Sequence, residues 1–215
     1  MIKKIIFVVI LLALIGGGYW YVVSQTKYPI NISSGWQTFK NDKYGYEVRY
    51  PQNAELLNPL DEDSTRVLLE KFLGIPTGLV AEKNNAIGGG LSFTVLIQSE
   101  SVPNPQNLSL KDWLFANTFS GPRMSPPPIA EEIIFAGVPA YYTEQVFPGK
   151  GGLYSYTRYT IYALRNGNLY QISGVKLPQS PTPEWLAHPY YQYLEQSIPI
   201  SEAILNSFRF TKISA

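Results

Sequence analysis

The stretch NDKYGYEVRYP, residues 41–51, combines a turn signal, a strict alternation of side chains and a proline. Every second position holds an aromatic or apolar residue: Tyr44, Tyr46, Val48 and Tyr50. Because successive side chains of a β-strand point to opposite faces, this alternation predicts a strand with one aromatic face and one polar face. The simplest interpretation buries the aromatic face in a core, and the alternative is a binding face. Pro51 ends the strand or marks an edge.

Outward from this stretch, the chain has many further strand signals. Strand composition or alternation occurs at residues 65–72, 91–98, 131–135, 140–147, 154–164, 169–175 and 208–212. The pair Asn166-Gly167 tolerates the positive φ angles of a tight turn and predicts a hairpin. Residues 137–139 predict another connection between strands. The second half of the chain is therefore expected to be an antiparallel meander.

Three helices are expected between and after these strands. Ser109 can cap a helix whose side chains Leu110, Trp113 and Leu114 fall on one side, so this helix should lie on a sheet. The order Thr182-Pro183-Glu184 gives a cap, a first-turn proline and an acidic first turn. Residues 201–207 predict a short third helix before the last strand.

The first 24 residues are expected to be a membrane anchor. Residues 5–23 carry no charge, and a helix of that length covers roughly 28 Å, about one hydrocarbon core. A cleavable signal peptide is the alternative. Lys3 and Lys4 predict that the N-terminus stays in the cytoplasm. Residues 25–35 would then be a linker, and residues 36–215 an extracytoplasmic domain of a single-pass cell-membrane protein.

Composition excludes several classes of function. The net charge is +1 and charged residues make up only 15%, so nothing steers nucleic acid to this chain. There is no cysteine, which rules out disulfides and thiolate metal sites. The single histidine, His188, is expected to be structural, and no serine-hydrolase, phosphate-loop or dinucleotide motif is present. We therefore expect no enzyme and no cofactor.

The order of several motifs resembles the PsbP-like family. These motifs are Asn41 to Pro51, the Leu-Lys-Asp-Trp-Leu helix at 110–114, Gly-Val-Pro-Ala at 137–140, the Asn-Gly hairpin, and Ile204 to Phe210. The resemblance implies an α+β fold with a central antiparallel sheet of six or more strands flanked by helices, an α/β/α sandwich. Well-known members are non-catalytic extrinsic subunits of the water-oxidising photosystem, and many bacterial relatives are membrane-anchored. No functional residues of the photosynthetic members are matched here.

One acidic cluster is a candidate metal site. Asp61, Glu62 and Asp63 could hold a hard cation, although no spaced loop with a turn glycine accompanies them, and a solvated loop is the alternative. Residues 74–90 contain Gly88-Gly89-Gly90 and little periodicity. This segment is expected to be a long loop of the kind that is often functional.

Surplus tyrosines suggest a binding surface. Tyr154, Tyr156, Tyr190 and Tyr191 are candidates, because exposed aromatic rings suit contact with a sugar polymer or a protein. The alternative is that tyrosine simply replaces charged residues on the surface. The sequence favours a membrane-anchored, non-catalytic accessory or assembly factor for an envelope protein complex, with an envelope protein as partner. The second hypothesis is a domain that binds a cation or a small ligand through Asp61 to Asp63 and the long loop.

Overall fold

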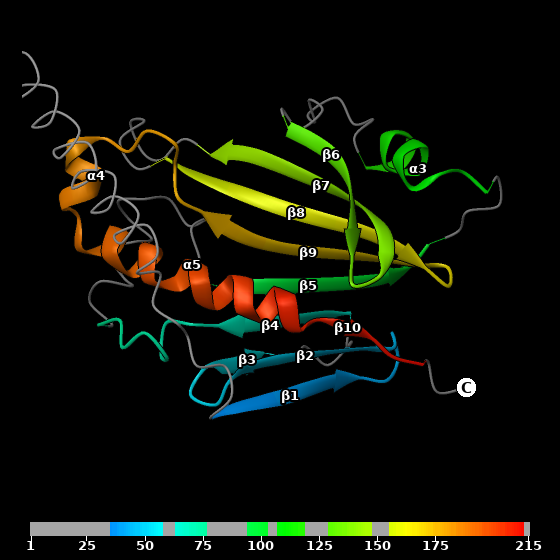
Figure 1. Cartoon of the computed structure of the whole chain (residues 1–215), viewed down its shortest axis with the longest axis horizontal. Helices are drawn as coiled ribbons and strands as arrows, with labels where there is room; N and C mark the ends of the chain where they lie inside the picture. The colour runs from blue at the N-terminus through cyan, green and yellow to red at the C-terminus, as the bar shows by residue number, and fades with distance from the viewer. Residues whose placement is uncertain are drawn as a thin grey trace, which may run out of the picture. The chain divides into compact units, whose positions relative to one another are not determined.

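The computed structural model describes residues 35–57, 63–76, 94–102, 107–118, 129–147 and 155–212. Three helices and ten strands occur in these ranges (Figure 1). The strands are β1 (Trp36–Asn41), β2 (Tyr46–Pro51), β3 (Glu55–Leu57), β4 (Ser64–Leu68), β5 (Thr94–Ser101), β6 (Ile129–Phe135), β7 (Val138–Phe147), β8 (Tyr156–Arg165), β9 (Asn168–Lys176) and β10 (Arg209–Phe210). The helices are α3 (Leu110–Asn117), α4 (Pro183–Ala187) and α5 (Pro189–Ser207).

The strands form two antiparallel sheets. A seven-stranded sheet has the order β3-β4-β5-β9-β8-β7-β6, and a three-stranded sheet has the order β1-β2-β10. Every pairing is antiparallel. The expected α+β class with an antiparallel sheet of six or more strands is confirmed, and the second, three-stranded sheet was not predicted. The terminal strand pairs with β2 and not with its neighbours in the meander.

The aromatic face of β2 lies in the core, as the simplest interpretation predicted. Tyr46 and Val48 are fully buried and Tyr44 and Tyr50 nearly so, while Arg49 on the other face is exposed. Gly45 has a φ of 64°, a left-handed conformation that glycine adopts without strain. It turns the chain from β1 into β2, so that the tyrosines of the opening stretch face the seven-stranded sheet.

An aromatic cluster fills the space between the two sheets. Tyr46 stacks on Phe208 with ring centroids 5.4 Å apart, and its ring meets that of Tyr170 edge-on at 6.3 Å. Phe210 contacts Tyr170 and Phe208, both at 5.0 Å between centroids. Residues from β2, β9 and the C-terminal segment thus share one core.

The last helix is longer than the sequence predicted. A short helix over residues 201–207 was expected, but α5 has 19 residues and runs through Pro199. Proline in a helix interior removes one hydrogen bond, a cost that burial of one helix face can offset. The buried residues on this face include Leu194, Ile200 and Ile204. The helix packs against β2, β5 and β9.

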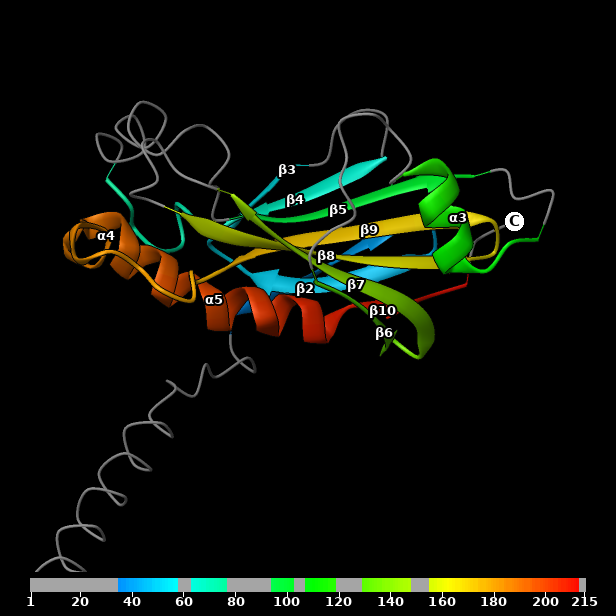
Figure 2. The same ribbon diagram turned by 90° about the horizontal axis from the view of Figure 1, so that it is seen from above.

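Helices α3 and α5 lie on opposite faces of the seven-stranded sheet (Figure 2). The three-stranded sheet lies on the same side as α5, because Tyr46 of β2 and Phe210 of β10 both contact Tyr170 of β9, and Phe208 at the end of α5 stacks on Tyr46. One face of the large sheet is therefore covered by a helix and a second sheet. The other face has the short helix α3.

Two tight turns between strands contain a glycine with a positive φ angle. Asn166 and Gly167 have φ angles of 53° and 74°, which confirms the predicted hairpin between β8 and β9. The connection predicted at residues 137–139 lies one residue earlier, at Ala136 and Gly137, with φ angles of 48° and 82°. Pro139 already belongs to β7, where a proline is tolerated because it lies near the start of the strand and the pairing with β8 begins only at Ala140.

Of the remaining predicted segments, some agree with the structure and others fall on residues that the structure does not describe. The helix starts at Ser109 and Thr182 are confirmed, since both side chains accept a backbone hydrogen bond from the third following residue. Most of the long loop at residues 74–90 and the predicted anchor at 5–23 lie outside the described residues. Within the described part of the chain, no helix combines the length and apolar character needed to cross a membrane.

Candidate functional site

The face of the seven-stranded sheet that carries α3 is polar and partly open. On β5, Val95, Ile97 and Ser99 are buried against the core, and the alternate residues of that strand face the other way. Gln98, for example, is exposed. β9 shows the same division, with Tyr170 and Ile172 buried and Gln171 half-buried. We call this polar side, with Gln98 and Gln171, the open face.

A groove of about 450 Å³ lies across the open face. It crosses five neighbouring strands, from β4 through β5, β9 and β8 to β7. The lining residues are mostly polar: Arg66, Leu68, Thr94, Leu96, Gln98, Gln145, Arg158, Thr160, Tyr162, Gln171, Ser173, Gly174 and Val175. A volume of this size lies within the usual range for sites that bind small molecules or segments of a chain.

Amides and hydroxyl groups form the floor of the groove. Gln98 and Gln171 stand opposite each other on β5 and β9. Their side chains, and that of Gln145, have no hydrogen-bond partner within the described part of the chain. Thr160 and Ser173 are also opposite each other, and their hydroxyl oxygens are 3.1 Å apart. The floor thus offers both donors and acceptors of hydrogen bonds.

Two arginines flank this floor. Arg66 on β4 is exposed, and Arg158 on β8 is half-buried with its guanidinium 4.8 Å from the centre of the Phe147 ring. The described lining residues include no Asp or Glu. The lining therefore contributes two positive charges, which favour a bound group with negative charge.

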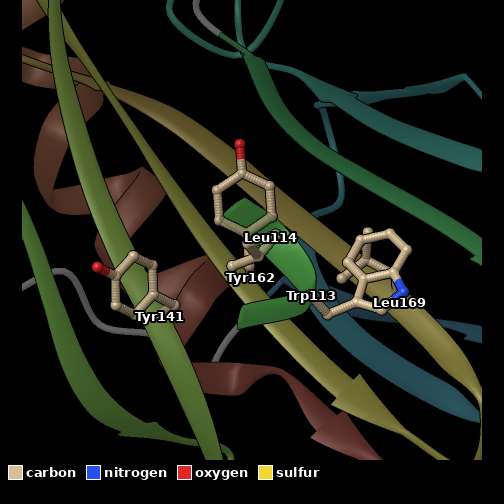
Figure 3. Close-up of a cluster of buried hydrophobic side chains, with 5 residues drawn as sticks. All are labelled: Trp113, Leu114, Tyr141, Tyr162 and Leu169. Carbon is tan, nitrogen blue, oxygen red and sulfur yellow. The ribbon is translucent and has the colours of Figure 1, made fainter. Parts of the chain in front are cut away.

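Helix α3 stands at one end of the groove. Trp113 and Leu114 are buried against Tyr141, Tyr162 and Leu169, which come from β7, β8 and β9 (Figure 3). Tyr162 belongs both to this cluster and to the groove lining. Because the ring is packed on two sides, burial raises the pKa of Tyr162. Helix α3, which the sequence predicted to lie on a sheet, therefore holds Tyr162 of the groove lining in position.

Of the four tyrosines predicted to form a binding surface, two are buried in the structure. Tyr156 and Tyr190 are buried, with 4% and 0% of their area exposed, so the prediction that they form a surface is wrong. Tyr156 stacks on Phe147 across β7 and β8, and Tyr190 on Trp185 of α4. Tyr191 is half-buried and meets Trp185 edge-on, and Tyr154 lies outside the described residues.

Asp63 is the described member of the acidic cluster, since Asp61 and Glu62 lie outside the described residues. Its carboxylate accepts hydrogen bonds from Lys43 Nζ at 2.7 Å and from the Tyr44 hydroxyl at 2.5 Å. The hydrogen bond from Lys43, and then that from Tyr44, lowers the pKa of Asp63. Among the described residues no group of three metal-ligating side chains occurs.

The predicted structural role of His188 is confirmed. It is the N-cap of α5, where its Nδ1 accepts a hydrogen bond from the Tyr190 backbone N–H at 3.2 Å. The ring lies 5.8 Å from that of Trp185, measured between centroids. This histidine orders the junction between α4 and α5.

A second group of titratable side chains was not singled out from the sequence. On the face opposite the groove, Glu144 of β7 accepts hydrogen bonds from the Tyr142 hydroxyl and from Lys176 Nζ on β9. Burial, and then the bond to Glu144, raises the pKa of Tyr142 to about 12. The ring of Tyr142 also stacks on Tyr159 at 6.2 Å between centroids. These contacts tie β7 to β8 and β9.

The groove was also missed, although its signal was present. On the strand predicted at 91–98, Thr94 and Gln98 are polar residues of the same parity, and both line the groove. Polar residues at alternate positions are usual on a solvated strand face, so one strand gives no warning of a site. The register of the strands was needed, because it places these side chains beside those of β8 and β9.

No protein-family model and no curated protein matches this chain. Solved structures that resemble it include a chain from Bacteroides thetaiotaomicron VPI-5482 (TM-score 0.43, 10% identity, 82% of this chain and 48% of that chain). This chain thus spans about half the length of that one. Cyanobacterial PsbP (CyanoP) from Synechocystis sp. PCC 6803 aligns with a TM-score of 0.39 and 10% identity, over 82% of this chain and 93% of that chain.

Proposed function

We infer that this protein is a non-catalytic binding domain, held outside the cytoplasm by an anchor at residues 5–23, which serves as an accessory factor for an envelope complex. The observation that carries the binding role is the groove on the open face. Its three glutamine side chains, Gln98, Gln145 and Gln171, have no partner within the described residues. Polar side chains that make no hydrogen bond within the protein and gather in one groove are free to bind and orient a ligand.

The chemistry of the lining suits holding a ligand more than transforming one. Amides and hydroxyls donate and accept hydrogen bonds and guanidinium groups donate them, but none of these groups exchanges protons readily near neutral pH. Arg66 and Arg158 keep their charge throughout the physiological range. Such groups orient a partner and neutralise its charge without a reaction.

The PsbP-like family is the proposed family, on the order of the sequence motifs. Those motifs correspond to β2, α3, the turn before β7, the hairpin between β8 and β9, and the segment from α5 into β10. They lie in separate elements, within the two sheets and on both faces of the seven-stranded sheet. The photosynthetic role of the well-known members is no part of the proposal.

Site-specific cross-linking in living cells tests the binding role. A photo-reactive amino acid replaces Gln171 in the groove, and in a matched control it replaces Gln192, which is exposed on α5. We expect adducts after illumination from position 171 and none from position 192. Equal labelling at both positions, or none at 171, would contradict the assignment of the groove.

Labelling of engineered cysteines tests the location. The chain has no cysteine, so one substitution gives a unique probe. We expect a membrane-impermeant maleimide to label Glu184→Cys in intact cells, because Glu184 is exposed, and to label Lys3→Cys only after the cells are opened. Protection of the Glu184→Cys variant in intact cells would place the domain inside and overturn this part of the proposal.

A further inference from the structure

We propose that the groove binds an acidic oligosaccharide, a chain of sugar rings that carry carboxylates. This inference rests on the proposed binding role and names the ligand class for the same groove. It follows from three features of the described residues: the spacing of the two arginines, the three unpaired glutamine side chains, and the elongated course of the groove across five strands.

The two arginines favour a ligand with negative charge at two separate points. In the register of the sheet, Arg66 lies in one row with Leu96, Ser173 and Thr160, and Arg158 is two residues from Thr160 on β8. With strands ~4.8 Å apart and ~3.3 Å per residue, the two Cα atoms are about 16 Å apart. The Arg158 guanidinium lies over the Phe147 ring of β7, on the side away from Arg66, so in this arrangement one small anion cannot meet both guanidinium groups. A chain with repeated carboxylates can, and each guanidinium can hold a carboxylate through two hydrogen bonds.

The glutamines favour a ligand that donates hydrogen bonds as well as accepting them. Each side-chain amide has one acceptor oxygen and one NH₂ donor group. A purely anionic ligand would use the NH₂ groups and would displace water from the oxygens of Gln98 and Gln171 without replacing its hydrogen bonds, at a cost in affinity. A sugar hydroxyl both donates and accepts, so it can satisfy both ends of a glutamine amide. Thr160 and Ser173 beside them add two further hydroxyl groups.

A peptide fits this surface less well than a sugar chain does. An extended peptide gains most of its affinity by pairing its backbone with the free edge of a strand. β5, β9 and β8 at the centre of the groove are paired on both sides, and so offer side chains but no free backbone edge. The side chains of these strands instead present closely spaced polar groups, which match the hydroxyls around a sugar ring.

Calorimetry on the full chain in detergent tests this assignment. The probes are a galacturonic acid hexasaccharide, a hyaluronan hexasaccharide, a neutral maltose-type hexasaccharide and a hexaglutamate peptide. We expect at least one acidic saccharide to bind, with an affinity that falls as salt rises, and the neutral saccharide and the peptide to bind about tenfold more weakly or not at all.

Variants separate the two kinds of contact. Arg66→Ala should weaken binding of the acidic saccharide about tenfold, because a charged hydrogen bond is lost. Gln171→Leu should weaken binding of the saccharide while leaving any residual affinity for hexaglutamate unchanged. Arg49→Ala is the matched control, since Arg49 is an exposed arginine on β2, away from the groove, and we expect no change.

Three outcomes would overturn the inference. Equal affinity for the neutral hexasaccharide would show that the arginines do not recognise charge. Equal affinity for hexaglutamate would show that the glutamines do not recognise hydroxyls and would favour an acidic peptide. Binding of neither acidic saccharide would exclude the ligand class. If cross-linking from position 171 succeeds while both saccharides fail, the binding role stands and this inference alone falls; if both fail, both fall.

Discussion

The two faces of the seven-stranded sheet are built by the same alternation of side chains but satisfy their polar groups differently. On the covered face, the Tyr46 hydroxyl is 2.8 Å from the Thr65 hydroxyl, and the Tyr170 hydroxyl donates to the Tyr44 carbonyl oxygen at 2.6 Å. On the open face, Gln98 and Gln171 have no such partners within the described residues. The comparison separates residues that hold the fold from residues that remain available to a ligand.

This difference has an energetic meaning. A buried polar group that loses its partner costs about 1–3 kcal/mol, whereas an exposed amide is already paired with water. Substitutions on the covered face should therefore change the free energy of unfolding, and substitutions on the open face should change binding and little else.

The largest effect is expected for Tyr46→Ala. The ring is fully buried and contacts Phe39, Tyr170 and Phe208, so its removal leaves a cavity between the two sheets. We expect a loss of about 3–5 kcal/mol in the free energy of unfolding, measured by urea denaturation. Should this variant fail to fold, Tyr46→Phe, which loses only the hydroxyl and its hydrogen bonds with Thr65 and Asn41, gives a smaller loss of about 1 kcal/mol. A loss below that of Tyr46→Phe would contradict the central role of this ring.

Gly174→Ala should be the next most costly substitution. A Cβ atom at this position would lie 2.1 Å from the hydroxyl oxygen of Tyr159 and 2.5 Å from Cζ of its ring. Tyr159 is buried and stands opposite Gly174 in the register of β8 and β9, so the ring has little room to move. We expect a loss of about 1–3 kcal/mol from overpacking, by the same denaturation measurement.

A control for this substitution is the double variant Gly174→Ala with Tyr159→Leu, which removes the colliding ring. Its cost should be well below the sum of the two single costs, because the two side chains are in contact. Additive costs would show that the Tyr159 ring is not what excludes a methyl group at position 174.

A matched pair of tyrosines tests whether hydrogen bonding decides the cost on the covered face. Tyr170→Phe leaves the carbonyl oxygen of Tyr44 without the hydroxyl donor, and we expect a loss of about 1–2 kcal/mol. Tyr159→Phe removes a buried hydroxyl that has no hydrogen-bond partner among the described residues, so stability should be unchanged or higher. Equal losses in both variants would show that ring packing, and not the hydroxyl, sets the cost.

The sequence predicted the covered face better than the open one. The alternation of Tyr44, Tyr46, Val48 and Tyr50 identified the buried side of β2, because apolar periodicity is a local signal. The Asn166-Gly167 turn and the Ser109 cap were also local and were confirmed. The continuation of α5 through Pro199 was missed, because packing against β2, β5 and β9 outweighs the local effect of proline.

The groove depends on long-range register, which no single segment contains. Gln98 and Gln171 are far apart in the sequence but opposite each other in the sheet. Tyr156 and Tyr190 show the converse error, since clustering in the sequence suggested a surface, whereas stacking on Phe147 and Trp185 buries them. An excess of tyrosine indicates that some rings are exposed without showing which ones, because burial is decided by partners from other strands.

A smaller effect is expected from Glu144 at low pH. Burial acts to raise the pKa of Glu144, but the hydrogen bonds from Lys176 and Tyr142 outweigh it, so the pKa lies below its usual 4.5. A carboxylate with a lowered pKa stabilises the fold above about pH 4.5 and loses that contribution as the pH falls through the lowered value. We expect Glu144→Gln to make the urea midpoint less dependent on pH in that acid range. An unchanged pH profile would contradict the coupling, whose size should stay below about 1 kcal/mol because Lys176 is half exposed.

The smallest effect on stability is expected in the groove itself. Gln98→Ala and Arg66→Ala remove exposed side chains that have no partner within the described residues, so the free energy of unfolding should change by less than about 0.5 kcal/mol. Thermal and urea unfolding of the two variants, compared with Gln192→Ala on α5, measure this. A loss above about 1 kcal/mol in either groove variant would mean that these side chains support the sheet. Their unpaired state would then no longer point to a ligand, and the division between the two faces would fail.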